Sequence, residues 1–297
     1  NIYKKINRDF YKILSHAFYE NYLIVSDNLG YLYSMNTNNG EIVWMTYHGI
    51  PFKSHIKIFN NKIFLADQNN KVLCFRVIDG SVVWNVQTEA SFIKSQGYFP
   101  LAISNDGYVF FINSSGEVYK IDAKNGEIIW SITSISSLKK VETDFFATSD
   151  IVIDNNTIFF TNIFSNTYSI NLKTGLINWK RNIRSKINPV IIDNYIFVLS
   201  KNGYVFNFDK ISGKIVWSRD IFKSFKKKKK EIKVSGFVIG SGKIYVTTTN
   251  GYLIVCSAQS GKTQFYKKIA KSIHLSPIIN NNRLYILTGE SRLIVFI

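Results

Sequence analysis

The chain has few of the residues that cross-link, interrupt or bind metal in a fold. Its 297 residues include two Cys, four Pro and four His. The two cysteines, Cys74 and Cys256, fall in predicted strands of different repeats, so buried free thiols are a better interpretation than a disulfide. No Pro- or Gly-rich linker divides the sequence, and we expect a single domain over residues 1–297. No apolar run reaches the ~18 residues that indicate a membrane-spanning helix.

Acidic residues are also scarce, because 20 Asp and Glu face 37 Lys and Arg and leave a net charge of +17. Most acids lie in predicted turns, as Asp79 and Asp122 do, and no carboxylate pair indicates acid–base catalysis. Five consecutive lysines, Lys226 to Lys230, form either a surface for an anionic partner such as lipid head groups, or a solvated loop in a Lys-rich chain. No nucleic-acid module accompanies them, so no nucleic-acid partner is predicted.

The chain does contain a repeated phrase that ends in tryptophan. Its first copy reads Gly-Tyr-Leu-Tyr-Ser-Met-Asn-Thr-Asn-Asn-Gly-Glu-Ile-Val-Trp from Gly30 to Trp44. The terminal aromatics of successive copies are Trp44, Trp84, Trp130, Trp179, Trp217 and Phe265, spaced 38 to 49 residues apart. Four residues before each of them stands a glycine: Gly40, Gly80, Gly126, Gly175, Gly213 and Gly261. A repeat of this length indicates an architecture of stacked structural units.

Each repeat predicts four short strands. Runs of β-branched and aromatic residues, such as residues 22–26 and 195–200, are bounded by Asn, Asp, Gly and Ser and are too short for helices. The second and third strands are joined by Asn- and Gly-containing turns such as Asn202-Gly203. The six glycines of the phrase stand in the next turn, and we expect them to share a positive φ. Residues 109–112 are all apolar, which is typical of a sheet covered on both faces.

Covered four-stranded antiparallel sheets repeated around an axis predict an all-β fold, the β-propeller. Each tryptophan is then packing material between neighbouring blades. Seven sets of strands begin near His16, His55, Phe99, Ser149, Asn188, Ser235 and Ser276, so we count seven blades. The seventh lacks its tryptophan strand, and we expect residues 2–6 to supply it and close the ring by pairing the two termini. An eighth blade in a longer parent protein remains an alternative.

No cluster of side chains indicates catalysis. His16, His55 and His274 fall near inner strands of different blades, where they either bind a metal or line a wet channel, and we favour the channel. The stretch Gly240-Ser-Gly-Lys243 lacks the full spacing of a phosphate loop and is predicted to be a turn between two strands. The sequence therefore predicts no catalytic, cofactor-binding or metal-binding residues.

The stretch from Gly116 to Trp130, Gly-Glu-Val-Tyr-Lys-Ile-Asp-Ala-Lys-Asn-Gly-Glu-Ile-Ile-Trp, resembles the repeat of pyrroloquinoline-quinone-type propellers. That superfamily includes quinone-dependent dehydrogenases and non-enzymatic scaffolds, so the resemblance leaves both functions open. The dehydrogenases hold a Ca²⁺-bound quinone, an Asp base and commonly two adjacent bonded cysteines. Here Cys74 and Cys256 are far apart and the blades lack long insertions, which favours a scaffold. A sensory or ligand-binding propeller is a further alternative.

From about His16 onward the chain is more similar to the BamB-type propellers of the outer-membrane β-barrel assembly machinery. The resemblance implies a non-catalytic lipoprotein scaffold in the periplasm, at the inner face of the outer membrane of a Gram-negative bacterium. Its partners would be the barrel-inserting subunit and unfolded outer-membrane proteins. The family usually has eight blades and a lipidated N-terminal Cys, whereas this sequence shows seven blades and no such Cys.

The same resemblance implies where the partner docks. A hydrophobic–basic step in one connector makes a main contact in the family. The matching residues here are Phe92 and Ile93, as apolar anchors, and Lys94, as their charged neighbour. Acids of a later connector make a second contact, and Asp144 and Glu142 lie near that place. The alternative for Phe92 and Ile93 is ordinary burial under the connector.

Overall fold

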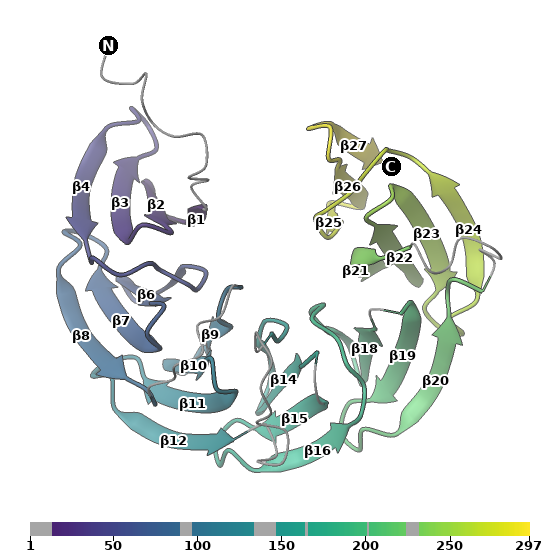
Figure 1. The fold of residues 1–297 in the computed structure, drawn as a ribbon, viewed down its shortest axis with the longest axis horizontal. Helices are drawn as coiled ribbons and strands as arrows, with labels where there is room; N and C mark the ends of the chain where they lie inside the picture. The colour runs from purple at the N-terminus through teal and green to yellow at the C-terminus, as the bar shows by residue number, and fades with distance from the viewer. Residues whose placement is uncertain (1–13, 90–96, 134–146, 164–165, 201, 224–231) are drawn as a thin grey trace. The chain divides into compact units, whose positions relative to one another are not determined.

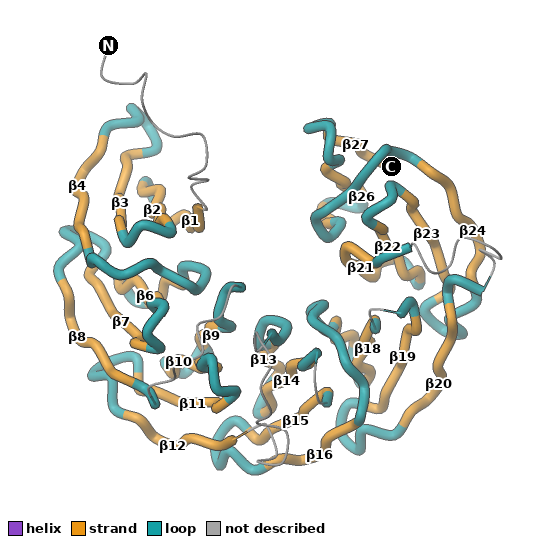
Figure 2. The backbone as a smooth tube through the Cα atoms, in the orientation of Figure 1, coloured by secondary structure: helices purple, strands orange, loops and turns teal. Residues whose placement is uncertain are grey.

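The computed structural model describes residues 14–89, 97–133, 147–163, 166–200, 202–223 and 232–297. These residues form only strands, turns and loops, as Figure 2 shows. None of them belongs to an apolar helix of membrane-spanning length. The chain divides into two compact units, residues 1–147 and 148–297, which we call the first and the second unit. The expectation of a single domain over residues 1–297 stays a prediction.

The first unit holds three four-stranded antiparallel sheets, each of which runs in sequence order from its first strand to its fourth (Figure 1). Blade 1 consists of β1 (Leu14–Tyr19), β2 (Tyr22–Asp27), β3 (Tyr31–Asn36) and β4 (Ile42–Tyr47). Blade 2 consists of β5 (Lys57–Phe59), β6 (Lys62–Ala66), β7 (Lys71–Arg76) and β8 (Val82–Gln87). Blade 3 consists of β9 (Leu101–Ile103), β10 (Tyr108–Ile112), β11 (Glu117–Asp122) and β12 (Ile128–Thr133).

The second unit continues the same pattern. Blade 4 consists of β13 (Val152–Asp154), β14 (Thr157–Thr161), β15 (Thr167–Asn171) and β16 (Ile177–Arg181). Blade 5 consists of β17 (Val190–Ile192), β18 (Tyr195–Leu199), β19 (Tyr204–Asp209) and β20 (Ile215–Asp220). Blade 6 consists of β21 (Val234–Gly240), β22 (Lys243–Thr248), β23 (Tyr252–Ser257) and β24 (Thr263–Lys268). Blade 7 shows β25 (Ile278–Asn280), β26 (Arg283–Leu287) and β27 (Leu293–Phe296).

The predicted fold class, an all-β propeller of seven antiparallel blades, is confirmed by these sheets. In the described part of the chain the seventh blade has three strands. The predicted closing strand, residues 2–6, lies outside the described residues. Gly240-Ser-Gly-Lys243 forms the predicted turn between β21 and β22, with Ser241 and Gly242 at positive φ.

Every blade has two distinct ends. The turns after its first and third strands lie together, since the N–H of Leu172 donates to Asn156 O (2.9 Å) and that of Lys210 to Asn194 O (2.8 Å). We call this the hairpin end. The turn after the second strand lies beside the connector to the next blade, because the N–H of Ile221 donates to Gly203 O (3.0 Å). We call this the connector end.

The repeated glycines serve both the turn and the neighbouring blade. Their φ angles are all positive, between 63° and 80°, as predicted. Gly80, Gly126, Gly213 and Gly261 also leave room for the tryptophan of the preceding blade. A Cβ on Gly80 would lie 2.5 Å from the Trp44 ring, and one on Gly126 would lie 2.9 Å from Trp84. Glycine is therefore required here for its backbone and for its lack of a side chain.

The tryptophans join the blades, as predicted. The indole N–H of Trp84 donates to the carbonyl oxygen of Ala123 in the next blade (3.1 Å). The indoles of Trp44 and Trp179 bond in the same way to Val77 O (2.8 Å) and Lys210 O (3.0 Å). These three rings thus bury apolar area while their indole N–H groups are hydrogen-bonded. Phe265 has no N–H to donate, and it is 50% exposed.

The core lies between the sheets, where strands bury both faces. Residues 109–112 of β10 are all fully buried, which confirms that this sheet is covered on both sides. Cys74 and Cys256 are free and fully buried, as predicted. Burial raises the pKa of the Cys74 thiol to about 12 and also raises that of Cys256. Both cysteines are therefore packing residues that stay protonated near neutral pH.

Candidate functional site

The predicted docking residues fall on two connectors of the first unit. These residues are Phe92, Ile93, Lys94 and Asp144, together with Glu142. All of them lie outside the described residues, so their role stays a prediction. The structure does describe the two ends of the connector from β8 to β9, at residues 88–89 and 97–99. Both of these ends are held by contacts with neighbouring segments.

Asn70 fixes the departing end of this connector. It is 1% exposed and lies in the turn that joins β6 to β7 in blade 2. Its carbonyl oxygen accepts the Thr88 N–H (3.2 Å) and hydroxyl (2.6 Å). Its side-chain amide donates to Glu89 O (3.2 Å) and to the Ser114 hydroxyl (2.8 Å). One buried side chain thus ties the connector to the turns of blades 2 and 3.

A buried phenol makes a second tie. The Tyr119 hydroxyl accepts the Glu89 N–H (3.2 Å) and donates to Glu117 Oε2 (2.6 Å). The same carboxylate oxygen accepts from the Asn113 amide (2.9 Å). Burial, and then the hydrogen bond to Glu117, raise the pKa of Tyr119 well above its usual value. The phenol therefore stays protonated and keeps donating across the neutral range.

The arriving end is held by packing. The ring of Tyr98 stacks on His55, with centroids 4.4 Å apart and planes 26° apart. Phe99 is 2% exposed, and its N–H donates to Lys53 O (2.5 Å). Phe99 also forms a parallel bridge with Ser54, which is fully buried. The chain re-enters the protein against the connector that precedes blade 2.

These contacts leave residues 90–96 to cross from blade 2 to blade 3 between two fixed ends. The backbones of Thr88 and Glu89 on one side and of Phe99 on the other are hydrogen-bonded to neighbouring segments.

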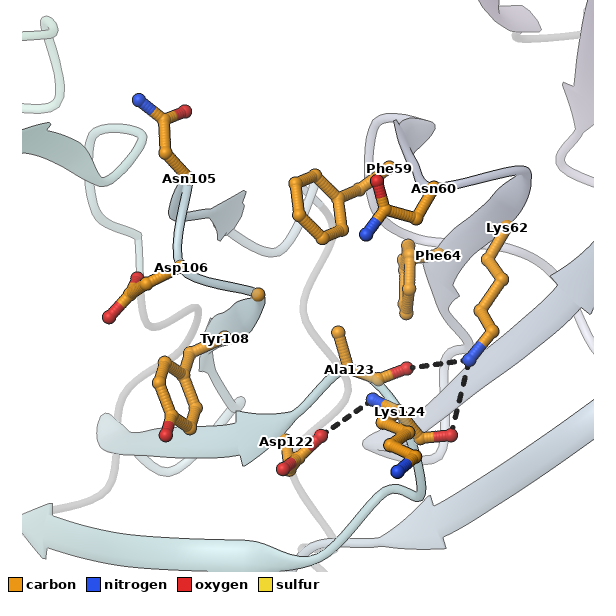
Figure 3. A pocket seen from close by; sticks show the side chains of 11 residues that line it. Phe59, Asn60, Lys62, Phe64, Asn105, Asp106, Tyr108, Asp122, Ala123 and Lys124 are labelled. Carbon is orange, nitrogen blue, oxygen red and sulfur yellow. Dashed lines mark hydrogen bonds between the residues drawn. The ribbon is translucent and has the colours of Figure 1, made fainter.

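The hairpin end of the same joint carries a hollow of about 440 Å³ (Figure 3). It is lined by the rings of Phe59, Phe64 and Tyr108 and by charged side chains of both signs, Lys62, Asp106, Asp122 and Lys124. The Lys62 ammonium donates to the carbonyl oxygens of Ala123 (3.4 Å) and Lys124 (3.2 Å). Asp122 accepts the Lys124 N–H (2.6 Å). Lys62 and Asp122 are therefore hydrogen-bonded within the protein, and the other two charged side chains, Asp106 and Lys124, have opposite signs.

The histidines considered as metal ligands are engaged separately. His16 packs edge-on against Phe18, with centroids 6.2 Å apart. His55 stacks on Tyr98, and its Nδ1 lies 3.5 Å from the Ser15 hydroxyl. His274 is an exposed residue of the second unit. Within the described ranges, no three His, Cys, Asp or Glu side chains are grouped to hold a metal ion.

A buried polar pair between blades 1 and 2 was not predicted from the sequence. His48 Nε2 lies 2.9 Å from Asp67 Oδ2, and Asp67 is fully buried. The other Asp67 oxygen accepts the N–H groups of Asn69 (2.8 Å) and Lys71 (3.1 Å) and so holds the turn after the second strand. The sequence carries a signal for the turn residue but not for its His partner. An Asp or Asn stands three residues before a positive-φ residue in each blade of the first unit: Asp27, Asp67 and Asn113.

Similarity to known proteins agrees with the blade geometry. A solved structure of BamB from Moraxella catarrhalis superimposes with a TM-score of 0.79 at 14% identity, over 98% of this chain and 86% of that one. A europium-containing methanol dehydrogenase superimposes with a TM-score of 0.67 at 11% identity, over 95% of this chain and 72% of that one. At these identities both likenesses show the fold alone.

Similarity in sequence distinguishes between the BamB family and the dehydrogenases. The outer membrane protein assembly factor BamB of Moranella endobia (strain PCIT) is 22% identical over 305 residues, which cover 95% of this chain and 74% of the relative. The family model described as outer membrane protein assembly factor BamB matches residues 6–219, which is most of the chain. The chain therefore belongs to the BamB family of outer membrane protein assembly factors.

Proposed function

We propose that this protein is a non-catalytic scaffold that docks on the periplasmic domains of the outer-membrane barrel insertase through the connector between β8 and β9. The observation that carries the proposal is the pair of fixed ends around residues 90–96. Asn70 and Tyr119 hold one end, and the Tyr98–His55 stack holds the other. Membership of the BamB family supports the assembly role.

The chemistry of the connector suits a protein interface. Phe92 and Ile93 supply adjacent apolar side chains, and Lys94 supplies a cation beside them. A few apolar anchors with a neighbouring charge commonly carry most of the binding energy of an interface. Asp144 would add a contact of opposite sign from the later connector. The cation and the acid would orient the partner more than they would tighten binding.

The proposed location follows from the same role. A scaffold that serves barrel insertion works in the periplasm, at the inner face of the outer membrane. Unfolded outer-membrane proteins are then its second class of partner. A lipid anchor would hold such a scaffold at the membrane.

The test is binding of this chain to the purified periplasmic domains of the insertase, measured by calorimetry or surface plasmon resonance. The double variant Phe92→Ala, Ile93→Ala should weaken binding by tenfold or more, since two anchors cost about 2 kcal/mol or more. The matched control is Val82→Ala, Val83→Ala. These two apolar residues are exposed on β8 of the same blade (53% and 41%) and lie outside the proposed site.

Each outcome separates the role from the site. Weak binding of the connector variant with normal binding of the β8 variant supports both. Equal binding of all three proteins supports the scaffold role and removes the site. If wild type fails to bind, the docking proposal is wrong. Incubation with pyrroloquinoline quinone and Ca²⁺ tests the non-catalytic role, and dye-linked alcohol oxidation would contradict it.

A further inference from the structure

The net charge of the chain belongs almost entirely to one unit. The first unit contains 14 Lys and Arg and 13 Asp and Glu, a net charge of +1. The second contains 23 Lys and Arg and 7 Asp and Glu, a net charge of +16. A general excess of lysine in the chain would load both units alike. The asymmetry therefore points to an anionic partner of the second unit.

One hollow of the second unit has the chemistry to receive an anion. Its volume is about 360 Å³, and it lies at the connector end between blades 4 and 5. Its polar lining consists of Asn182, Arg184, Ser200, Asn202 and Tyr204, and Ile183 and Phe206 form the apolar back. No acidic side chain lines it, in contrast to the mixed hollow of the first unit. A guanidinium with amide and hydroxyl donors is a typical set of partners for a phosphate.

The backbone that carries Arg184 is fixed on both sides. Ile183 is 9% exposed, and its carbonyl oxygen accepts the Thr167 hydroxyl (3.0 Å). Ser185 is 1% exposed, and its hydroxyl donates to Leu199 O (2.7 Å) and accepts the Ile187 N–H (2.9 Å). Arg184 itself is exposed between these two buried neighbours. Its guanidinium is thus presented at the hollow from a rigid base.

The facing turn is equally constrained. The Ser200 hydroxyl accepts the Tyr204 N–H (3.0 Å), and Ser200 O accepts the Gly203 N–H (3.0 Å). A Cβ on Gly203 would lie 2.3 Å from the Phe222 ring, so this turn is packed against the following connector. Tyr204 stacks on Phe206, with centroids 6.2 Å apart, and is 41% exposed. The stacked rings of Tyr204 and Phe206 therefore form one wall of the hollow, and the Tyr204 hydroxyl adds a polar group to it.

Further cations lie at the connector ends of blades 4 to 7. They are the exposed side chains Lys186, Lys223, Lys233, Lys271 and Arg292. The described acids at these connector ends are Asp150, Asp220 and Glu290. Asp150 accepts from the Asn188 amide (2.9 Å), Asp220 accepts the Phe222 N–H (3.0 Å), and Glu290 accepts the Lys271 N–H (3.1 Å). All three carboxylates are thus hydrogen-bonded within the protein.

We propose that the connector end of the second unit binds an anionic phospholipid membrane, with a headgroup phosphate in the Arg184 hollow. The cations are spread over four blades, and this suits a surface whose charges move laterally better than a protein with fixed charges. An exposed tyrosine beside basic residues is typical of the water–membrane boundary. This surface is separate from the connector proposed for insertase docking, and it needs no protein partner.

The test is co-sedimentation of the full chain with phosphatidylglycerol–phosphatidylcholine vesicles and with phosphatidylcholine vesicles. Wild type should bind the anionic vesicles at least tenfold more tightly. Arg184→Gln should lower the partition coefficient about fivefold, the share expected of one cation near an anionic surface. The matched control is Lys262→Gln, an exposed cation at the hairpin end of blade 6. The five lysines from 226 to 230 stay unchanged in every protein, and thermal unfolding checks that each variant is folded.

Every outcome decides the proposal. A fivefold loss for Arg184→Gln with no loss for Lys262→Gln supports it. Equal losses for both variants overturn the site and leave only attraction by net charge. Binding of wild type to both vesicle types alike, or to neither, overturns the membrane. Full competition by millimolar inorganic phosphate assigns the hollow to a free anion instead. Loss of vesicle binding with insertase binding intact separates this inference from the docking proposal.

Discussion

The two units are built from the same blade but differ in what they present to solvent. Both use the turn glycine, the interblade tryptophan and central strands that are largely buried. Their net charges, +1 and +16, differ far more than their sheets do. Interblade packing thus constrains only the strands and turns, and the connector ends remain open to variation. The repeat specifies the fold, and we expect the connectors, which differ from blade to blade, to determine the partners.

The interblade joints show a finer version of the same contrast. In the first unit Trp84 is 8% exposed and bonds to Ala123 O. In the second unit Trp217 lies over Gly261 in the same way, with 2.5 Å to a Cβ placed there. Its indole nitrogen is buried without a hydrogen-bond partner among the described residues. An unpaired buried donor destabilises the contact between two blades, so equivalent tryptophans should not contribute equally to the free energy of unfolding.

The largest expected effect comes from removing these rings. Trp84→Ala should lower the free energy of unfolding by about 3–5 kcal/mol, because it opens a cavity and leaves the joint without its donor. Trp217→Ala should cost less, about 2–3 kcal/mol, since that ring is only partly buried and its N–H is unpaired. Native-state hydrogen exchange resolves the two joints separately.

Phenylalanine variants sharpen this comparison. Trp84→Phe should cost about 1–3 kcal/mol through the lost indole hydrogen bond and ring area, whereas Trp217→Phe should be close to neutral. Equal losses for the two variants would show that the missing partner of Trp217 has no energetic consequence.

The next effect distinguishes the two roles of the repeated glycine. Gly40 and Gly126 share a positive φ (74° and 80°), but a Cβ on Gly40 meets nothing within 4 Å. Gly40→Ala should therefore cost about 1–2 kcal/mol, the strain of a left-handed residue alone. Gly126→Ala should cost about 2–4 kcal/mol, because its Cβ also displaces the Trp84 ring. Chemical denaturation followed by tryptophan fluorescence measures both, and a larger loss at Gly40 would contradict the packing role.

Much of this architecture could be predicted from the sequence because it is repeated. A turn glycine and an aromatic four residues later recur six times, and each copy confirms the others. The sequence alone predicts that residues 109–112 are buried on both faces of their sheet, because all four are apolar. What recurs in sequence was therefore predictable.

What occurs once was not predictable. The hydrogen bonds from Asn70 to Glu89 and Ser114 join residues 19 and 44 positions apart, and no local sequence pattern predicts them. The His48–Asp67 pair likewise depends on the register between two blades. The docking residues Phe92, Ile93 and Lys94 were inferred from a resemblance, and their role stays a prediction.

Alkaline pH compares the buried thiols of the two units. The pKa of Cys74 is raised from about 9 to about 12 by burial. Between these values the unfolded chain loses the proton and the folded chain keeps it, so stability falls as pH rises above about 9. Cys74→Ala should remove about 1 kcal/mol of that fall by pH 10. Burial also raises the pKa of Cys256, against the opposing effect of the Thr263 hydroxyl, so Cys256→Ala should likewise remove part of the fall. Urea unfolding at pH 8 and pH 10 gives the difference, and identical slopes for wild type and Cys74→Ala would contradict it.

The smallest effect concerns the charge asymmetry itself. Like charges on one unit repel one another, and salt screens this repulsion over about 10 Å at 0.1 M. Raising NaCl from 0.05 to 0.5 M should therefore stabilise the second unit by about 0.5–1 kcal/mol and leave the first nearly unchanged. Amide exchange in β18 and β6, the central strands of blades 5 and 2, reports on each unit. Equal slowing in both strands would mean that salt acts through apolar burial, which the units share, instead of through charge, which they do not. Slowing in β18 alone would show that the second unit tolerates a standing repulsion, and an anionic surface bound there would relieve it in the same way.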